Sequence, residues 1–322
     1  MTDSNTKMSV VMTVYNGEAF LTEAVRSILE QSFQDYEFVI VDDGSTDRSA
    51  EIIRNHRDER IRFFPLNHIG RAAALNYAIA QTTSPLVAIM DADDIALPQR
   101  LQVEFDVLSK DDAIDVVSSS YIIINAQGKV IREKYLPVTH QAIVDLMPVQ
   151  CSMCFPASVI RKRIILNAGM FDERSTVSED YEFWLKILGR AKFSNVPMSL
   201  IKYRVSQNST SVKFKKSQFQ RSYQLGSQYL EERLRTQQDR ESRALIILQL
   251  GKREYYSGTM ASARRYFAKL LWSKSLMRFA WRYYLSSLLG DRFFSFLRKS
   301  GVADRLGRLF RRRSMKHDYF MP

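Results

Sequence analysis

Short apolar runs alternate with segments of helical periodicity over the first 120 residues of the chain. A continuous apolar run predicts a strand that is buried on both faces, as in a parallel sheet. The segments between the runs space their apolar residues three and four positions apart, as amphipathic helices do. This alternation is typical of a parallel sheet flanked by helices. The runs predict strands at residues 9–14, 38–41, 61–64 and 86–90.

Beyond residue 120 the pattern is less regular but still predicts both kinds of element. We therefore expect an α/β domain over residues 1–211, built on a mostly parallel twisted sheet, and an α-helical C-terminal region over residues 212–322. Helical spacing dominates from about residue 215. The remaining expected elements are further strands and loops within 114–160, a helix near 141–147, a helix at 178–188 and a last strand at 201–204. Ser45 or Thr46 can cap the helix after the strand at 38–41, and Pro98 is placed to open the helix after the strand at 86–90.

Polar clusters follow the first, second and fourth of the predicted strands. In an open parallel sheet these strand ends meet at one edge, which is where ligands bind.

Charge separates the same two regions. The 322 residues carry a net charge of +12, yet residues 1–211 hold 22 Lys and Arg against 27 Asp and Glu. Residues 212–322 hold 25 against 8, so all of the excess positive charge lies in the C-terminal region. No run of 18 apolar residues predicts a membrane-spanning helix, and no secretory signal pattern opens the chain. Two cysteines exclude a disulfide framework, so we expect a cytoplasmic protein.

Asp91 and Asp93 directly follow the predicted strand at 86–90. Two carboxylates at this spacing, at the end of a buried strand, suit a hard divalent cation such as Mg²⁺ or Mn²⁺ that is also bound by substrate phosphates. The alternative is a solvated acidic turn before the next helix. The pair alone does not decide between the two.

Asp42 and Asp43 follow the predicted strand at 38–41 and are succeeded by Gly44, which permits a tight turn. Their carboxylates could accept hydrogen bonds from a nucleobase or from ribose hydroxyls, or could simply form a strand-to-helix turn. Glycine-rich phosphate loops of the GxGxxG and GxxxxGK[ST] types are absent. This absence argues against a dinucleotide oxidoreductase and against a P-loop enzyme.

Glu179 and Asp180 open the predicted helix at 178–188. Acidic residues are stabilised at a helix N-terminus by the helix dipole, which is a sufficient structural reason for them. An ionised carboxylate there could equally accept a proton from an attacking hydroxyl. Spacing does not choose between these roles.

The ordered set of motifs resembles the family 2 glycosyltransferases over about residues 8–211. No single motif carries the resemblance, which depends on many of them recurring in one order. The matching segments are Ser9-Val10-Val11-Met12-Thr13-Val14-Tyr15-Asn16-Gly17, Val41-Asp42-Asp43-Gly44-Ser45-Thr46-Asp47, Asn67-x-x-Gly70 with Ala74-Leu75-Asn76, Met90-Asp91-Ala92-Asp93-Asp94 with Pro98-x-Arg100-Leu101, Gly169-x-Phe171-Asp172-Glu173, Ser178-Glu179-Asp180-Tyr181-x-Phe183-Trp184, and Tyr203-Arg204-Val205 with Asn208-Ser209-Thr210-Ser211.

The resemblance implies a Rossmann-like nucleotide-diphospho-sugar transferase fold and an inverting single displacement, with residues 1–211 as the glycosyltransferase domain. It implies that Asp93, together with Asp91, binds the divalent cation, and that Asp180 is the general base, with Glu179 as the alternative. A UDP-sugar is the favoured donor, and a saccharide or lipid-linked saccharide in polysaccharide synthesis of the cell envelope is the expected acceptor. The expected donor-binding residues are Thr13, Tyr15, Asn16, Asp42, Asp43, Arg71, Asn76 and Asp91.

Two positions depart from the family pattern. Thr13 stands where the family commonly has Pro, which should affect only backbone rigidity. Ser206 stands near the place where many members carry a His, so a third protein ligand to the cation and a water in its place both remain open. A nucleotidyltransferase would need a Gly-rich, Arg-containing first loop, which is missing. A binding protein without transferase activity would lack the acidic pair or Asp180, and all three residues are present.

The C-terminal region mixes aromatic and basic residues, as helices in a membrane interface do. Several basic residues near an anionic leaflet would hold the protein at the cytoplasmic face as a peripheral protein, each contributing about 1 kcal/mol. The alternative is that the aromatic residues pack against the first domain. No nucleic-acid-binding module is visible, so we expect no nucleic acid partner. The residues concerned include Leu276, Phe279, Trp281, Arg282, Tyr284, Arg292, Phe293, Phe294, Leu297, Arg298, Lys299 and Arg311–Arg313.

Cys151 and Cys154 have the spacing of half a zinc site, but no second pair of ligands accompanies them. Zinc takes four ligands, and free cysteines are commonly buried, so we interpret both as structural. The four histidines are scattered along the chain and make no case for nucleophilic catalysis.

Overall fold

A computed structural model describes residues 6–175, 177–206, 214–271, 273, 276, 277 and 279–288. The chain divides into two compact units, residues 1–222 and residues 223–322, which are described separately below. The junction expected after residue 211 falls in the stretch 207–213, outside the described residues.

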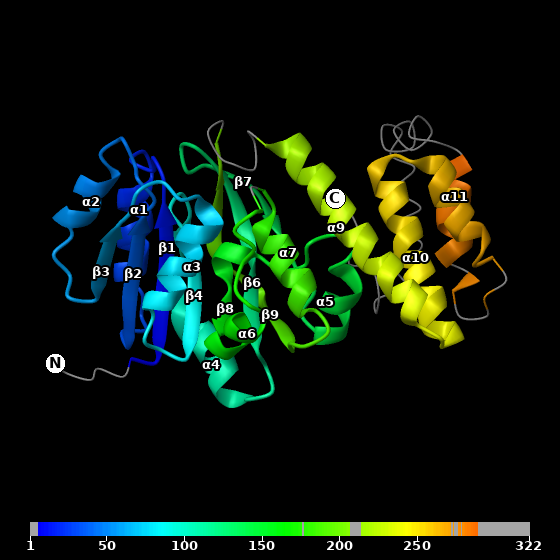
Figure 1. Cartoon of the computed structure of the whole chain (residues 1–322), viewed down its shortest axis with the longest axis horizontal. Coiled ribbons are helices and arrows are strands. Elements are labelled where there is room, and N and C mark those ends of the chain that lie inside the picture. Colours follow the sequence, from blue (N-terminus) through cyan, green and yellow to red (C-terminus); the bar gives the residue numbers. More distant parts are fainter. Residues whose placement is uncertain are drawn as a thin grey trace. The chain divides into compact units, whose positions relative to one another are not determined.

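Unit 1 is built on a nine-stranded sheet in the order β3-β2-β1-β4-β8-β6-β9-β5, with β7 paired to β6 (Figure 1). The half containing β3, β2, β1 and β4 is parallel. Beyond β4 the sheet is mixed: β8 is antiparallel to β4 and β6, whereas β9 is parallel to β6. The strands are β1 (Met8–Val14), β2 (Tyr36–Asp42), β3 (Ile61–Pro65), β4 (Leu86–Asp91), β5 (Ile95–Ala96), β6 (Val116–Asn125), β7 (Val130–Lys134), β8 (Val159–Arg161) and β9 (Phe193–Val205).

Helices flank this sheet, as the alternating pattern predicted. The even-numbered residues of β1 are fully or almost fully buried and share one core with α1, because side chains along a strand alternate between its faces. Helix α3 contacts β1 and β2. The helices of unit 1 are α1 (Leu21–Leu29), α2 (Ser49–Asn55), α3 (Arg71–Gln81), α4 (Arg100–Lys110), α5 (His140–Leu146), α6 (Lys162–Asn167), α7 (Glu179–Ile187), the 3₁₀ helix η1 (Phe155–Ala157) and the first part of α9 (Lys215–Thr236).

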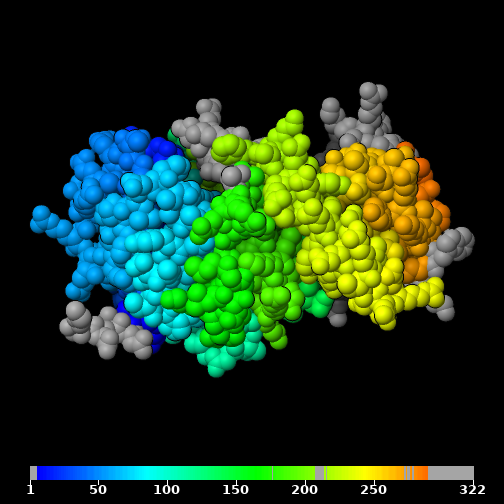
Figure 2. All heavy atoms as spheres, in the orientation of Figure 1, coloured from blue at the N-terminus to red at the C-terminus, as the bar shows by residue number. Residues whose placement is uncertain are grey.

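The space-filling view shows the cyan segment that includes α3 lying against the green segment that includes α6 and α7 (Figure 2). A buried hydrogen-bonded bridge joins the two. The Asn76 side chain donates from Nδ2 to the carbonyl of Phe171 at 2.9 Å and accepts the Phe171 N–H at 3.0 Å. Asn76 is only 9% exposed, so the bridge fixes α3 relative to the segment that leads into α7.

Two local expectations about helix starts differ from the structure. Ser45 and Thr46 were expected to cap the second helix, but α2 begins at Ser49 and its N-cap is Arg48. Ser45 Oγ instead accepts the N–H of Asn16 at 2.9 Å, a contact between two loops that local sequence does not reveal. Pro98 was expected to open the next helix, but α4 begins at Arg100.

In unit 2, α10 (Arg240–Ser257) and α11 (Met260–Ala268) pack together with the helical residues 279–288. Asp239 caps α10 by accepting the N–H of Ser242 at 2.7 Å. Gly251 allows the fully buried Phe267 ring to approach, because a Cβ at this position would lie 2.6 Å from a ring carbon. Among the described residues, no helix combines the length and the apolar character needed to cross a bilayer. The basic residues within the stretch 292–313 lie outside the described residues.

Candidate active site

The carboxyl ends of β1, β2 and β4 meet at one edge of the sheet. In the register, Val14 pairs with Asp42 of β2, and Thr13 pairs with Asp91 of β4. Parallel strands in register place their following loops together, and ligands of open α/β sheets bind at this edge. The polar loops that follow these three strands therefore lie together at one edge of the sheet.

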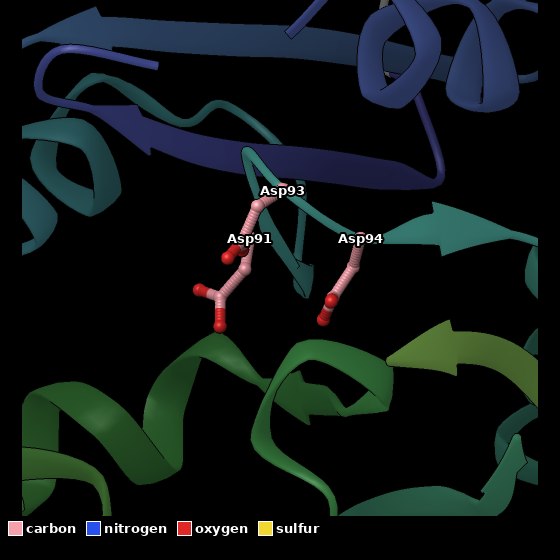
Figure 3. A group of neighbouring side chains, drawn as sticks. All are labelled: Asp91, Asp93 and Asp94. Atoms are coloured by element: carbon pink, nitrogen blue, oxygen red, sulfur yellow. The ribbon is translucent and has the colours of Figure 1, made fainter. Parts of the chain in front are cut away.

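Asp91, Asp93 and Asp94 bring their carboxylates together at the end of β4 (Figure 3). One oxygen from each of the three lies within 4.8 Å of the others, and the side chains point to the same side of the turn. Among the residues that the structure describes, this is the one group of three or more His, Cys, Asp or Glu side chains that could hold a metal ion. Carboxylate oxygens are the ligands that Mg²⁺ and Mn²⁺ prefer, so the donor set fits such a cation.

Asp94 is the member of this group that sequence reasoning did not assign to the site. It is 1% exposed, its Oδ1 accepts the Arg204 N–H at 2.7 Å, and its Oδ2 has no hydrogen-bond partner among the described residues. Burial and the neighbouring Asp93 and Asp91 charges raise the pKa of Asp94 well above its ordinary value. A buried carboxylate with an unsatisfied oxygen is costly, and a nearby cation would offset that cost.

Arg204 holds the acidic turn from β9. Its Nε donates to the carbonyl of Asp93 at 2.8 Å, and its guanidinium lies 4.5 Å from the centre of the Phe20 ring. Because the Arg204 side chain is almost fully buried, its position is fixed, unlike that of a mobile surface charge. Ser206 directly follows β9, two residues after Arg204. The stretch 207–213 beyond it, with its Asn-Ser-Thr-Ser motif, lies outside the described residues.

Arg71 lies between the acidic turn and the helix α7. Its Nη2 donates to Asp91 Oδ1 at 2.9 Å, and its Nη1 lies 3.1 Å from Glu179 Oε1. Asp91 and Glu179 raise the pKa of Arg71, which keeps its charge fixed. The guanidinium is therefore the positive group at the centre of an otherwise acidic site, and its side chain is still 39% exposed.

Glu179 and Asp180 occupy the first turn of α7, after Ser178 in a left-handed conformation with φ 65°. Glu179 is 5% exposed and faces Arg71, whereas Asp180 is more accessible. Burial, followed by the Glu179 charge, raises the pKa of Asp180 to about 6, and the Arg71 charge opposes this shift. A carboxylate with a pKa close to neutral is suited to accept a proton at physiological pH.

The loops after β1 and β2 are tied to each other. Asn16 has φ 51°, and its Oδ1 accepts the Thr46 N–H at 2.8 Å. Asp42 is 3% exposed, and its Oδ1 accepts the Ser45 N–H at 3.1 Å. Tyr15 directly precedes Asn16 and is exposed, and its expected contact with the donor stays a prediction.

Asp43 and Asn76 are used within the protein. Asp43 accepts the N–H groups of Ile69 and Gly70 at 2.7 and 3.0 Å, which positions the start of α3. The Asn76 amide uses both Nδ2 and Oδ1 in its hydrogen bonds with Phe171, and Nδ2 donates a further hydrogen bond to Glu173. The contacts of these two residues are structural ones, and their expected contact with a donor stays a prediction.

Cys151 lies near Asp180, and Cys154 lies near Asp94. Both are free thiols, and Cys154 is buried. Burial raises the pKa of Cys151 to about 12, so its thiol stays protonated at neutral pH. An unreactive, protonated thiol agrees with the structural interpretation made from the sequence.

Comparison with known proteins gives the family. The model of glycosyl transferase family 2 matches residues 9–168. An uncharacterized glycosyltransferase of Methanocaldococcus jannaschii is 32% identical over 210 residues, which cover 62% of this chain and 70% of the relative. The O-antigen biosynthesis glycosyltransferase WbnJ of Escherichia coli is 29% identical over 213 residues, which cover 63% of this chain and 81% of the relative.

Solved structures share the fold. Residues 1–349 of S. aureus TarS in complex with UDP-GlcNAc align with a TM-score of 0.56 at 18% identity, over 87% of this chain and 89% of that chain. The mannosyltransferase PcManGT from Pyrobaculum calidifontis, in complex with GDP-Man and Mn²⁺, aligns with a TM-score of 0.54 at 16% identity, over 95% and 87%. The nucleotide-diphospho-sugar transferase fold expected from the sequence is confirmed, and the chain belongs to glycosyl transferase family 2.

Proposed function

We propose that this glycosyltransferase is metal-dependent and inverting, and that it moves a sugar from a UDP-sugar to a hydroxyl group of a saccharide or lipid-linked saccharide. The observation that carries the proposal is the acidic turn, Asp91 to Asp94, which lies across Arg71 from the carboxylates of α7. One side of this site suits a metal diphosphate and the other side suits an acceptor.

In the proposed mechanism, Asp93 and Asp91 would hold the divalent cation, and Asp94 lies beside them. The bound cation would neutralise charge on the departing diphosphate. Asp180 accepts the proton of the acceptor hydroxyl, and the resulting oxygen forms a bond to the anomeric carbon. The bond from that carbon to the diphosphate oxygen breaks on the opposite face, so the configuration inverts and a nucleoside diphosphate leaves.

The relatives support the donor class and the setting of the reaction. TarS is solved with UDP and with UDP-GlcNAc, and PcManGT with GDP-Man and Mn²⁺. We favour a UDP-sugar as the donor, in agreement with the expectation from the family resemblance. WbnJ is named for O-antigen biosynthesis, and we propose cell-surface polysaccharide synthesis on the cytoplasmic side of the membrane for this chain too.

The C-terminal region would hold the enzyme at that membrane. Met277, Trp281, Leu285 and Leu288 are each at least 41% exposed, and their spacing places them along one side of a helix. The exposed side chains suit the interface of an anionic leaflet better than they suit a core.

Release of nucleoside diphosphate from a panel of UDP-, GDP-, CDP- and dTDP-sugars, with and without EDTA, tests the proposal. We expect release from a UDP-sugar in the presence of Mn²⁺ or Mg²⁺ and its loss with EDTA. Binding of a nucleotide sugar without release, given acceptor extracts, would favour a protein that only binds the donor. Formation of a nucleotide sugar from a nucleoside triphosphate would favour the nucleotidyltransferase alternative.

A further inference from the structure

Two exposed rings stack on each other at the nucleotide edge of the sheet. The centroids of Tyr15 and His68 lie 4.2 Å apart, and their planes meet at 25°. Tyr15 follows β1, and His68 lies in the loop between β3 and α3. Tyr15 is 52% exposed and the His68 side chain is 54% exposed, so neither ring is part of the core. Exposed aromatic faces at a ligand-binding edge are suited to stack a planar ring.

His68 is the fixed member of the pair. Its Nδ1 lies 3.0 Å from the carbonyl oxygen of Asp43 and 3.0 Å from Asp43 Oδ2. Both partners are acceptors, so Nδ1 carries the proton. In the neutral ring, Nε2 is then the unprotonated nitrogen and can accept a hydrogen bond. The ring is thereby held in one orientation with an acceptor at its far end.

The backbone at His68 is also fixed. Gly44 has φ 74°, and a Cβ built on it would lie 2.6 Å from the backbone nitrogen of His68. The loop after β2 and the loop before α3 are therefore in direct contact, and the Asp43 carboxylate bonds two further N–H groups of the second loop. These contacts fix the position of the His68 ring, and the Tyr15 ring stacks on one of its faces.

We propose that His68 forms one wall of the nucleobase site and that the donor's base stacks on the ring face that Tyr15 covers in this structure. This inference rests on the proposed function and names a residue that contacts the donor's base. A separation of 4.2 Å leaves no space for a third ring, so Tyr15 rotates away and closes over the opposite face of the base. Nε2 of His68 accepts a hydrogen bond from a donor hydroxyl or N–H group at the edge of the stack.

The test compares the affinity for UDP of the full-length chain with that of His68→Ala and His68→Phe, by calorimetry in the presence of Mn²⁺. Base–aromatic stacking predicts a Kd that is about tenfold higher for His68→Ala. His68→Phe keeps the stacking face and should stay within about threefold of the wild-type Kd. His56→Ala is the matched control, because His56 lies at the other end of α2, and its Kd should equal that of the wild type.

Kinetics and spectroscopy extend the test. For His68→Ala, KM for the donor should rise while kcat with saturating donor changes little, because the base does not take part in bond breaking. Addition of UDP to the wild type should shift the ring resonances of both His68 and Tyr15, as one stacking partner is exchanged for another.

The outcomes separate this inference from the proposed function. If the wild type binds none of UDP, GDP, CDP and dTDP, the proposed function itself is wrong. If the wild type binds UDP and transfers sugar while His68→Ala has an unchanged Kd, the function stands and the role of His68 is refuted. An equal loss in His68→Ala and His68→Phe would refute stacking as the source of the affinity.

Discussion

Arg71 and Asp91 are joined by a hydrogen bond of 2.9 Å, from Nη2 to Oδ1, across the centre of the site. The same guanidinium reaches Glu179 at 3.1 Å, so the first residue of α3 connects the end of β4 with the start of α7. The proposed donor side and the proposed acceptor side therefore share the positive charge of Arg71. A change at Arg71 should affect both sides.

Arg71→Ala should lower kcat/KM and move the acidic limb of the pH–rate profile to higher pH. The pKa of Asp180 is about 6, and the Arg71 charge opposes its rise. Removal of the Arg71 charge should therefore raise the pKa of Asp180 further. Arg71→Lys keeps the charge but not the fork that reaches both carboxylates, and it should move the limb less. A profile of log kcat/KM between pH 5 and 9 measures the shift. An unchanged limb in Arg71→Ala would show that Arg71 does not influence the base.

Asp93→Asn should lower kcat by about 10²-fold or more, because it removes a ligand charge from the cation that stabilises the leaving group. The affinity for Mn²⁺ in the presence of UDP should fall with it. The measurement is nucleotide release at saturating donor, together with a Mn²⁺ titration. Asp112→Asn, at a side chain that is 97% exposed, is the control and should behave as the wild type. Wild-type kcat in Asp93→Asn would contradict the assignment.

Asp180→Asn should lower kcat by about 10²-fold or more, the scale of a lost general base. Glu179→Gln should have the smaller effect, because Glu179 is buried against Arg71, whereas Asp180 is more accessible. In the wild type, activity should fall as the pH drops through about 6, since protonated Asp180 cannot accept a proton. Single-turnover rates with the acceptor measure these effects. A larger loss in Glu179→Gln would reverse the two roles.

Asp180→Asn should also stabilise the folded chain at neutral pH. The pKa of Asp180 is raised in the folded state, so the folded chain binds more protons than the unfolded chain between pH 4 and 6. This residue's contribution to stability therefore falls as the pH rises through that window. Asparagine removes the charge, and the gain at pH 7.5 should be on the order of 1 kcal/mol. Urea unfolding at pH 7.5 and at pH 4 measures it, and the gain should shrink at pH 4.

The full-length chain should sediment with anionic liposomes, and a chain truncated after residue 288 should sediment less. Aromatic and basic side chains near an anionic surface contribute together, so added salt should weaken the binding. Neutral phosphatidylcholine vesicles are the lipid control. Equal sedimentation of the two chains, or none with anionic vesicles, would refute a membrane role for the C-terminal region and favour packing within the protein.

The sequence predicted the parallel half of the sheet because its strands are continuous apolar runs. It also predicted that the loops containing Asp42 and Asp91 would meet, since that follows from parallel order alone. It did not predict that Ser45 bonds Asn16 in place of capping α2, because this choice depends on a loop 29 residues away.

The remaining differences have the same physical origin. Asp94 is next to Asp93 in the motif, yet its burial depends on Arg204, and only the folded chain brings the two together. His68 lies between Asn67 and Ile69 with no local pattern that marks it, and its stacking on Tyr15 depends on how two loops approach each other. Local patterns predict elements, whereas contacts between distant segments decide which side chains complete a site.

The hydrogen bond from Arg204 to Asp94 closes a loop of 110 residues. Closing so long a loop costs chain entropy before any contact repays it, and such pairings form slowly. The acidic turn therefore reaches its final geometry only when β9 has docked beside β6. Binding of the proposed metal nucleotide should therefore appear late in refolding, and its appearance would report that the last strand is in place.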